Sequence, residues 1–135
     1  MATITGGCLC GRVRYASQGD ALFGVLCHCR DCQRTSGTGR VPVMGVLKST
    51  FRVTGETKSY SVLGGSQKQA IRHFCPNCGS LLFGTPEVVP HIVTIYVGSL
   101  DRPNAFRPQY AQFTRDRPDW DRFDVNLPEY ETIPT

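Results

Sequence analysis

Seven cysteines fall in three short clusters within the first 78 residues of this 135-residue chain. In chain order the clusters are Cys8 and Cys10; Cys27, Cys29 and Cys32; and Cys75 and Cys78. Isolated cysteines are usually small buried apolar residues, whereas thiols two or three positions apart are typical metal ligands. An odd number of cysteines cannot pair completely as disulfides within one chain. The clusters therefore predict metal binding through thiolates.

The third cluster has the form of a zinc knuckle, Cys75-Pro-Asn-Cys78, and a glycine follows it. Two such thiolates bind one zinc ion at ~2.3 Å each, and the glycine lets the turn open toward the metal. Two ligands do not complete a tetrahedron, and Cys8 with Cys10 is the pair left over. We therefore expect a closed structural zinc site of four thiolates, which would contribute to folding stability.

The middle cluster places three thiols within six residues, so all three can reach one metal. Cys27, Cys29 and Cys32 would leave the fourth position of a second zinc ion open, as in catalytic sites. Water, a substrate thiol or a substrate oxygen could occupy that position, and a zinc-bound thiol loses its proton. Spacing alone does not determine which pairs meet, so a single zinc site or a redox cluster remain alternatives.

The other polar residues near the clusters are weaker candidates. In an extended segment His28 would point away from a metal held by its two neighbours, and we expect it to pack or to face substrate. His73 and His91 lie in strand-like segments and are expected to be packed or on the surface. Asp31 and Arg34 flank Cys32, where they are either polar helix-surface residues or groups that orient a ligand.

The charge balance argues against a nucleic-acid partner. The formal net charge is +4, and seven thiolates with two divalent zinc ions would lower it to near +1. Residues 1–100 hold ten Lys or Arg against four Asp or Glu, and residues 101–135 hold five against seven. The basic residues therefore accompany the cysteines and form no dense stripe of the kind that binds nucleic acid.

No apolar stretch approaches the ~20 residues of a membrane helix, and the N-terminus is too polar for a signal peptide. We expect no membrane association and a cytoplasmic location, where clustered cysteines are more often metal ligands or nucleophiles than disulfides.

Short alternating segments with many glycines and prolines indicate a mainly β protein, a folded-over sheet or sandwich. One short helix is expected at 29–36, ending at Gly37. The expected strands are 3–8, 12–17, 21–27, 40–47, 50–54, 58–63, 69–74, 80–83, 91–97 and 109–114. A tight turn at Cys10-Gly11 and a hairpin turn at Gly64-Gly65 join neighbouring strands.

We expect one domain over residues 1–135, with an irregular C-terminal segment at about 117–135 packed on the core. The apolar residues expected to attach this segment are Trp120, Phe123, Leu127 and Tyr130. Trp120 is expected to be a core anchor, or alternatively to shape a pocket near the open site.

The cysteine segments resemble the glutathione-dependent formaldehyde-activating enzyme family, which includes centromere protein V. The matching segments are GGCLCGRVRY at 6–15, CHCRDCQRTSG at 27–37, RHFCPNCGSLLF at 72–83 and VGSLDRPNAFRP at 97–108, with a looser match at 120–131. The resemblance implies a β-tent fold of small sheets around two zinc sites. It also implies a structural zinc on Cys8, Cys10, Cys75 and Cys78, and a catalytic-type zinc on Cys27, Cys29 and Cys32. Relatives commonly carry an aromatic residue after the Ser-Gly pair, where this chain has Thr38-Gly39-Arg40, so the pocket there is expected to differ.

The function expected from this resemblance is that of a carbon–sulfur lyase acting on a thiol–aldehyde adduct of the glutathione type. A thiol cosubstrate would bind the open zinc, lose its proton and attack a small aldehyde, and nearby arginines could hold a carboxylate. The first alternative is a non-catalytic zinc-binding interaction module, which a single zinc or a fourth protein ligand would favour. A second is a redox switch in which the middle cluster forms a disulfide. The oligomeric state cannot be derived from the sequence.

Overall fold

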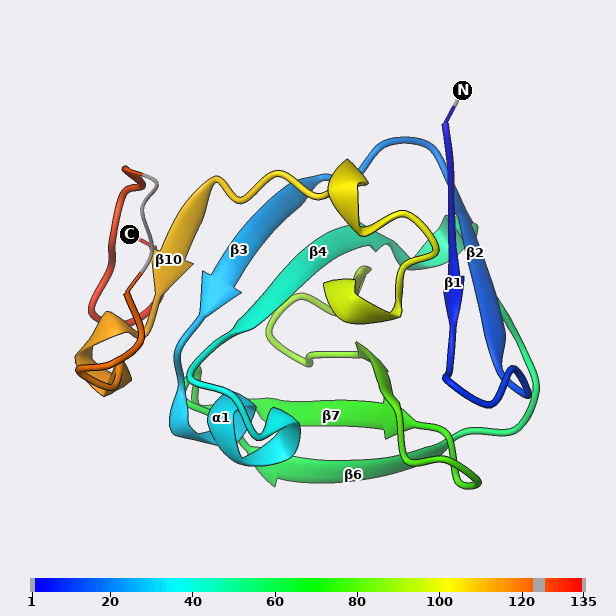
Figure 1. The fold of residues 1–135 in the computed structure, drawn as a ribbon, viewed down its shortest axis with the longest axis horizontal. Coiled ribbons are helices and arrows are strands. Elements are labelled where there is room, and N and C mark those ends of the chain that lie inside the picture. The colour runs from blue at the N-terminus through cyan, green and yellow to red at the C-terminus, as the bar shows by residue number, and fades with distance from the viewer. Residues whose placement is uncertain (1, 123–125, 135) are drawn as a thin grey trace.

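A computed structural model describes residues 2–122 and 126–134. Within these residues the protein is mainly β, with two sheets and one α-helix, which confirms the expected fold class (Figure 1). The strands are β1 (Thr3–Gly7), β2 (Arg14–Gln18), β3 (Phe23–Cys27), β4 (Val41–Leu47), β5 (Phe51–Thr54), β6 (Lys58–Leu63), β7 (Gln69–Phe74), β8 (Leu81–Gly84), β9 (Ile92–Tyr96) and β10 (Tyr110–Gln112). The α-helix is α1 (Arg30–Ser36), and four short 3-10 turns are η1 (Lys48–Thr50), η2 (Val97–Ser99), η3 (Pro103–Ala105) and η4 (Thr114–Asp116). No described helix is long and apolar enough to cross a membrane.

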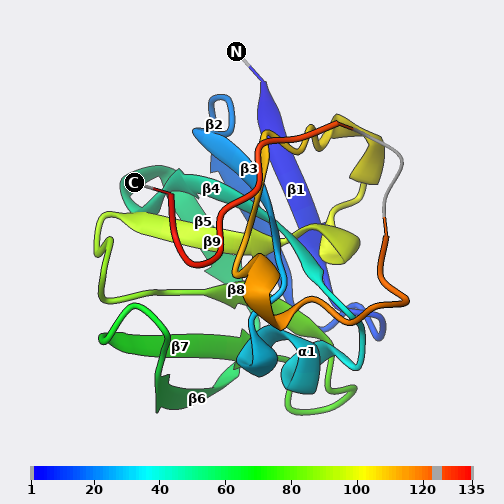
Figure 2. The same cartoon turned by 90° about the vertical axis from the view of Figure 1, so that its left-hand side faces the viewer.

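The strands form a small antiparallel sheet and a larger mixed one. The small sheet has the order β1-β2-β5, and the larger has the order β10-β3-β4-β9-β8-β7-β6. Pairing is antiparallel throughout except between β10 and β3, which run parallel. Figure 2 shows β7 and β6 at the far end of the large sheet, next to α1. The sheet thus brings α1, which follows β3, close to β6 and β7, which come later in the chain, after β4 and β5.

Most element boundaries agree with the sequence expectation to within two residues. Strand β2 starts at Arg14 rather than at residue 12, because the Val13 carbonyl accepts from the Cys8 amide and closes the turn before it. Strand β10 ends at Gln112, because Phe113 adopts a left-handed backbone (φ 55°) and the 3-10 turn η4 follows. Both differences come from local turns that alternation of apolar residues does not report.

The main core lies between the two sheets. Tyr15 of the small sheet, Phe51 and Phe83 form a chain of ring contacts, with centroids 5.5 Å and 4.9 Å apart. Leu82 and Ile95 are completely buried beside them. A second cluster, which includes Val25, Val43 and Phe113, surrounds Cys27 and Cys32. The middle cysteine cluster is therefore set into a hydrophobic core of its own.

The C-terminal segment is attached differently from the expectation. Trp120 is 73% exposed, so the prediction that it anchors the core is wrong. Backbone hydrogen bonds hold the segment instead: Tyr130 N–H donates to Ala111 C=O, and Ala111 N–H donates to Pro128 C=O, each at 3.0 Å. The Tyr130 ring packs edge-on against Tyr110 at 5.8 Å, Leu127 is half-buried, and Phe123 lies outside the described residues.

Gly45→Ala is expected to destabilise the protein, because a Cβ at this position would lie 2.2 Å from the Phe23 ring. Such overpacking typically costs about 1–3 kcal/mol in the free energy of unfolding. The matched control is Gly98→Ala, where a Cβ would meet nothing within 4 Å, and a change within about 0.5 kcal/mol is expected. Denaturant unfolding of both variants checks this, and equal midpoints would contradict it.

Candidate functional site

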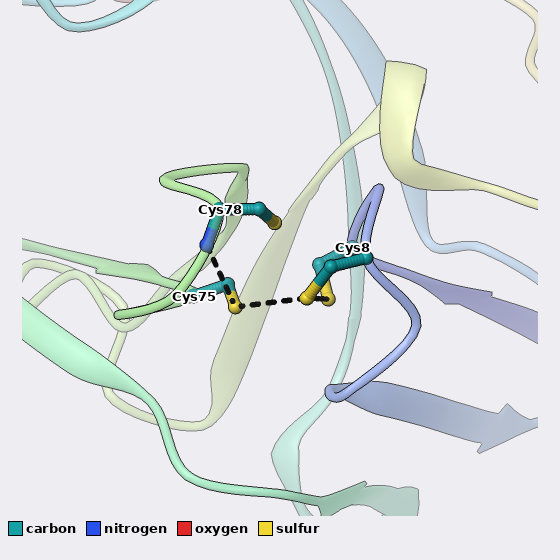
Figure 3. Close-up of side chains that lie close together, drawn as sticks. Cys8, Cys75 and Cys78 are labelled. Carbon is teal, nitrogen blue, oxygen red and sulfur yellow. Dashed lines mark hydrogen bonds between the residues drawn. The ribbon is translucent and has the colours of Figure 1, made fainter.

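The first and third cysteine clusters meet between two turns from different sheets. Cys8 and Cys10 lie in the β1–β2 turn, and Cys75 and Cys78 lie in the β7–β8 turn. Figure 3 shows the two turns facing each other with their sulfurs between them. All four sulfurs lie within 4.8 Å of one another. The structure therefore brings together the pairs that the sequence analysis assigned to one closed site.

The two turns are built alike and offer donors to sulfur. Gly11 and Gly79 both have positive φ, 82° and 77°, which glycine adopts without steric cost. The Val13 amide donates to Cys8 Sγ at 3.2 Å, and the Cys78 amide donates to Cys75 Sγ at 3.5 Å. A hydrogen bond from the Ser80 hydroxyl lowers the pKa of Cys78 to about 5. The environment favours the thiolate, the form in which cysteine binds a metal, at Cys8 and Cys78, whose pKa values are lowered, but not at Cys75, whose pKa is raised.

The sulfur spacing fits a tetrahedral zinc site. Ligands at ~2.3 Å from a tetrahedral ion lie about 3.8 Å apart. Cys10 Sγ lies 3.6 Å from Cys8 Sγ and 3.7 Å from Cys75 Sγ, and all seven cysteines are free thiols. The cluster is thus compatible with one metal ion and needs no ligand from elsewhere.

The middle cluster sits where β3 ends and α1 begins. Cys27 is the last residue of β3, Cys29 caps the helix by accepting from the Cys32 amide at 3.3 Å, and Cys32 lies in the first turn. Cys27 and Cys32 are buried, with sulfurs 3.6 Å apart, and Cys29 is half-buried. Among the described residues these three sulfurs form a group without a fourth His, Cys, Asp or Glu ligand atom. The spacing again suits a metal, with one ligand position left open.

Hydrogen bonds within the middle cluster shift the pKa values of its sulfurs in opposite directions. Donation from Cys29 and Cys32 lowers the pKa of Cys27, and the same bond with Cys27 raises the pKa of Cys32. Without a metal the cluster therefore concentrates negative charge on Cys27, and a cation would stabilise a fuller ionisation of the set.

Arg72 of β7 supplies a positive charge beside this cluster. Its Nη2 lies 3.6 Å from Cys32 Sγ, and the side chain is only 8% exposed. Burial alone would lower the pKa of Arg72, but the charge interaction and the hydrogen bond with the Cys32 sulfur raise it, so the guanidinium stays protonated. Burial also raises the pKa of Tyr96, which keeps its phenol protonated. The cluster thus faces one fixed cation and one hydroxyl donor.

The middle cluster opens onto a groove of about 390 Å³. Cys27, Cys29 and Cys32 all line it, together with Arg72 and Tyr96. Most of the remaining lining is apolar and comes mainly from β3, β4, β7, β10, the β6–β7 turn, the β8–β9 connection and the C-terminal segment. None of the four cysteines of the closed cluster lines this groove. Only the middle cluster is therefore accessible to a ligand bound there.

The histidines lie outside both sulfur groups. His28 is completely buried, and its Nδ1 lies 3.3 Å from Asp121 Oδ2, so its ring meets the C-terminal segment rather than the metal position. His73 stacks on Phe83 at 4.5 Å, and His91 is exposed. Asp31 lines the groove, whereas Arg34 is exposed. Trp120 does not line the groove. Its ring lies against Gly39, so close that a Cβ at Gly39 would be 2.8 Å from it.

Sequence reasoning did not single out Arg72 among the arginines near cysteines. Arg14, for comparison, is paired with Asp101, with Nη1 at 2.9 Å from Oδ1. The signal that could have pointed to Arg72 is its position in a strand-like segment, three residues before Cys75. A side chain in a strand faces one side of the sheet. Which side carries the middle cluster depends on strand order, which the sequence does not contain.

Comparison with known proteins agrees with this geometry. Residues 3–116 match the model of the family described as "Glutathione-dependent formaldehyde-activating enzyme". The chain belongs to that family. Within the family, a Halomonas elongata protein with the provisional name of glutathione-dependent formaldehyde-activating enzyme is 26% identical in an alignment of 123 residues, and the match covers 87% of this chain and 78% of the relative. A crystal structure of a Rhodobacter sphaeroides protein has the same fold, with a TM-score of 0.57 and 22% identity over 72% of this chain and 87% of that one. Membership supports an enzyme related to glutathione-dependent formaldehyde activation.

Proposed function

We propose that the protein is a zinc-dependent enzyme of the carbon–sulfur lyase type that acts on a thiol–aldehyde adduct. Cys27, Cys29 and Cys32 would hold the catalytic zinc, and the four-cysteine cluster would hold a structural one. The observation that carries this proposal is the difference between the clusters: three sulfurs without a fourth ligand line a groove, and the four-sulfur group does not. A cytoplasmic location is part of the proposal and is supported by seven free thiols.

The reaction would be the reversible splitting of a hydroxyalkyl thioether. The carbon–sulfur bond breaks, the hydroxyl proton is lost and the sulfur gains one, so a thiol and an aldehyde are released without an oxidant or reductant. Bound zinc would supply a positive charge that stabilises the thiolate form of the substrate sulfur. Arg72 would offset the negative charge of the cysteines, and the protonated Tyr96 would offer a hydrogen bond to substrate oxygen.

The closed cluster would act on stability rather than on chemistry. One of its turns belongs to the small sheet and the other joins β7 and β8 of the large sheet, so a metal there would link the two sheets through coordination bonds. A structural zinc contributes directly to the free energy of folding because the unfolded chain has no preformed site.

A non-catalytic interaction module is the alternative. It would be favoured by a fourth protein ligand at the middle cluster, and the described residues supply none. A redox switch would use the 3.6 Å approach of Cys27 and Cys32 sulfurs. Unchanged free thiols and metal content after mild peroxide would exclude it.

The proposal predicts two zinc ions per chain and turnover of a glutathione–aldehyde adduct. Mass spectrometry of the native protein measures the metal, and aldehyde release measured with a coupled dehydrogenase reports the reaction. Apo protein reloaded with one equivalent of zinc is the control, since turnover is expected only after the second equivalent. Two bound zinc ions without turnover or adduct binding would favour the interaction module.

A further inference from the structure

The groove beside the middle cluster has few charges. Apart from the three cysteines, Arg72 is the one cation and Asp31 the one anion among its lining residues. Apolar side chains such as Val25, Val43 and Phe113 make up most of the walls. Val88 and Ile133 also line the groove, and their side chains, 46% and 42% exposed, add to its apolar surface. The groove therefore offers little to a highly charged ligand.

This composition conflicts with a complete glutathione molecule in the groove. Glutathione carries two carboxylates and an ammonium group, and burying a charge without a partner is costly. A single guanidinium cannot pair both carboxylates, so the charged ends must lie outside the groove. An apolar chain, in contrast, gains about 25 cal/mol for each Å² removed from water.

Arg72 offers a place for one oxygen atom. Its Nε is buried and has no hydrogen-bond partner, although Nη2 contacts Cys32 Sγ. A buried donor without an acceptor costs about 1–3 kcal/mol, and an acceptor from a ligand would remove that penalty. Arg72 lines the groove together with the three cysteines and lies 3.6 Å from Cys32 Sγ, so the oxygen of an adduct held by its sulfur at the cysteines would be near this guanidinium.

The size of the groove also favours a ligand with an apolar chain. Its volume of about 390 Å³ falls within the range of ~300–1,000 Å³ that is usual for sites of small organic ligands. The single carbon of formaldehyde would leave most of this volume empty. We propose, on the basis of the function proposed above, that the substrate is an adduct carrying an apolar chain of several carbons close to its sulfur. The chain lies along the groove, and the adduct oxygen accepts a hydrogen bond from Arg72.

The test uses the zinc-loaded protein and a series of straight-chain thiols from ethanethiol to hexanethiol, with titration calorimetry as the readout. Affinity is expected to rise about fourfold for each methylene, the equivalent of about 0.8 kcal/mol. The matching alcohols, followed by NMR titration, probe the groove without sulfur and should show the same trend at lower affinity. An affinity that does not depend on chain length would overturn the inference.

Ala70→Leu narrows the groove, since Ala70 lines it in the same strand as Arg72 and two residues before it. This variant is expected to lose most of the gain from hexanethiol while binding ethanethiol as before. Ser61→Leu, at an exposed position of β6, is the matched control and should behave like wild type. Equal chain-length dependence in all three proteins would also overturn the inference.

Turnover separates this inference from the function on which it rests. Hexanal with glutathione and hexanethiol with formaldehyde are compared with glutathione and formaldehyde. If either long-chain pair reacts faster, the inference holds, and the faster pair identifies whether thiol or aldehyde supplies the chain. If glutathione with formaldehyde reacts as fast as both, the lyase stands and the apolar specificity is wrong. If no pair reacts but alcohols bind by chain length, the groove assignment stands and the lyase proposal fails.

Discussion

Cys10→Ser is expected to lower the melting temperature by 10 °C or more, corresponding to at least about 3 kcal/mol for a domain of this size. The Cys10 side chain is exposed, so in a protein without metal this exchange would change stability by no more than about 0.5 kcal/mol. A large loss would therefore report the metal itself. Structural zinc sites supply about 10–16 kcal/mol of binding energy in zinc-finger peptides, more than many domains have in total stability.

The control for Cys10→Ser is the same measurement in the presence of a strong chelator. Without metal, wild type and variant should melt together, because the exchange removes only an exposed sulfur. Metal analysis should show one zinc fewer in the variant. Equal melting temperatures before chelation would mean that the four sulfurs hold no metal that contributes to folding.

Cys29→Ser is expected to abolish turnover and to remove one of two zinc ions while the fold persists. Serine is among the preferred N-cap residues, so its hydroxyl can replace the sulfur that accepts from the Cys32 amide. The exchange thus keeps the start of α1 and removes one thiolate. Residues that merely orient a ligand cost 10–100-fold in metal affinity, so loss of a ligand should cost more than about 100-fold.

Circular dichroism and metal analysis check the Cys29→Ser variant alongside Cys32→Ser. Cys32 is buried and its sulfur contacts Arg72, so this second variant is expected to lose stability as well as metal. Turnover at the wild-type rate by Cys29→Ser would show that the reaction does not use the middle cluster.

The local features of the fold could be read from the sequence, and the long-range ones could not. Alternation and glycine spacing located the β6–β7 hairpin to the residue, with Lys58 paired to Phe74 and Leu63 to Gln69. The cysteine clusters were equally visible, because ligand spacing within a turn is a local property. The role of Arg72 was not visible, since it arises from the strand order that places β7 beside α1.

Trp120 shows the limit of composition as a guide. A large aromatic residue in an irregular segment is usually buried, yet this one is 73% exposed. Backbone hydrogen bonds to β10 already hold the segment, so no aromatic anchor is needed at that position. Such bonds depend on register with a distant strand, which no pattern within residues 117–135 reveals.

The residues that line the groove come from two parts of the chain, and one of them is the C-terminal segment. All seven cysteines and Arg72 lie within residues 3–116, the part shared with the family. Ile133 and Pro134, which line the groove, follow that part and are brought back beside β10 by the bonds of Tyr130 and Ala111. The metal ligands and these two groove-lining residues therefore come from different parts of the chain. Exchanging only the last twenty residues between relatives would be a direct way to change substrate preference while the chemistry stays the same.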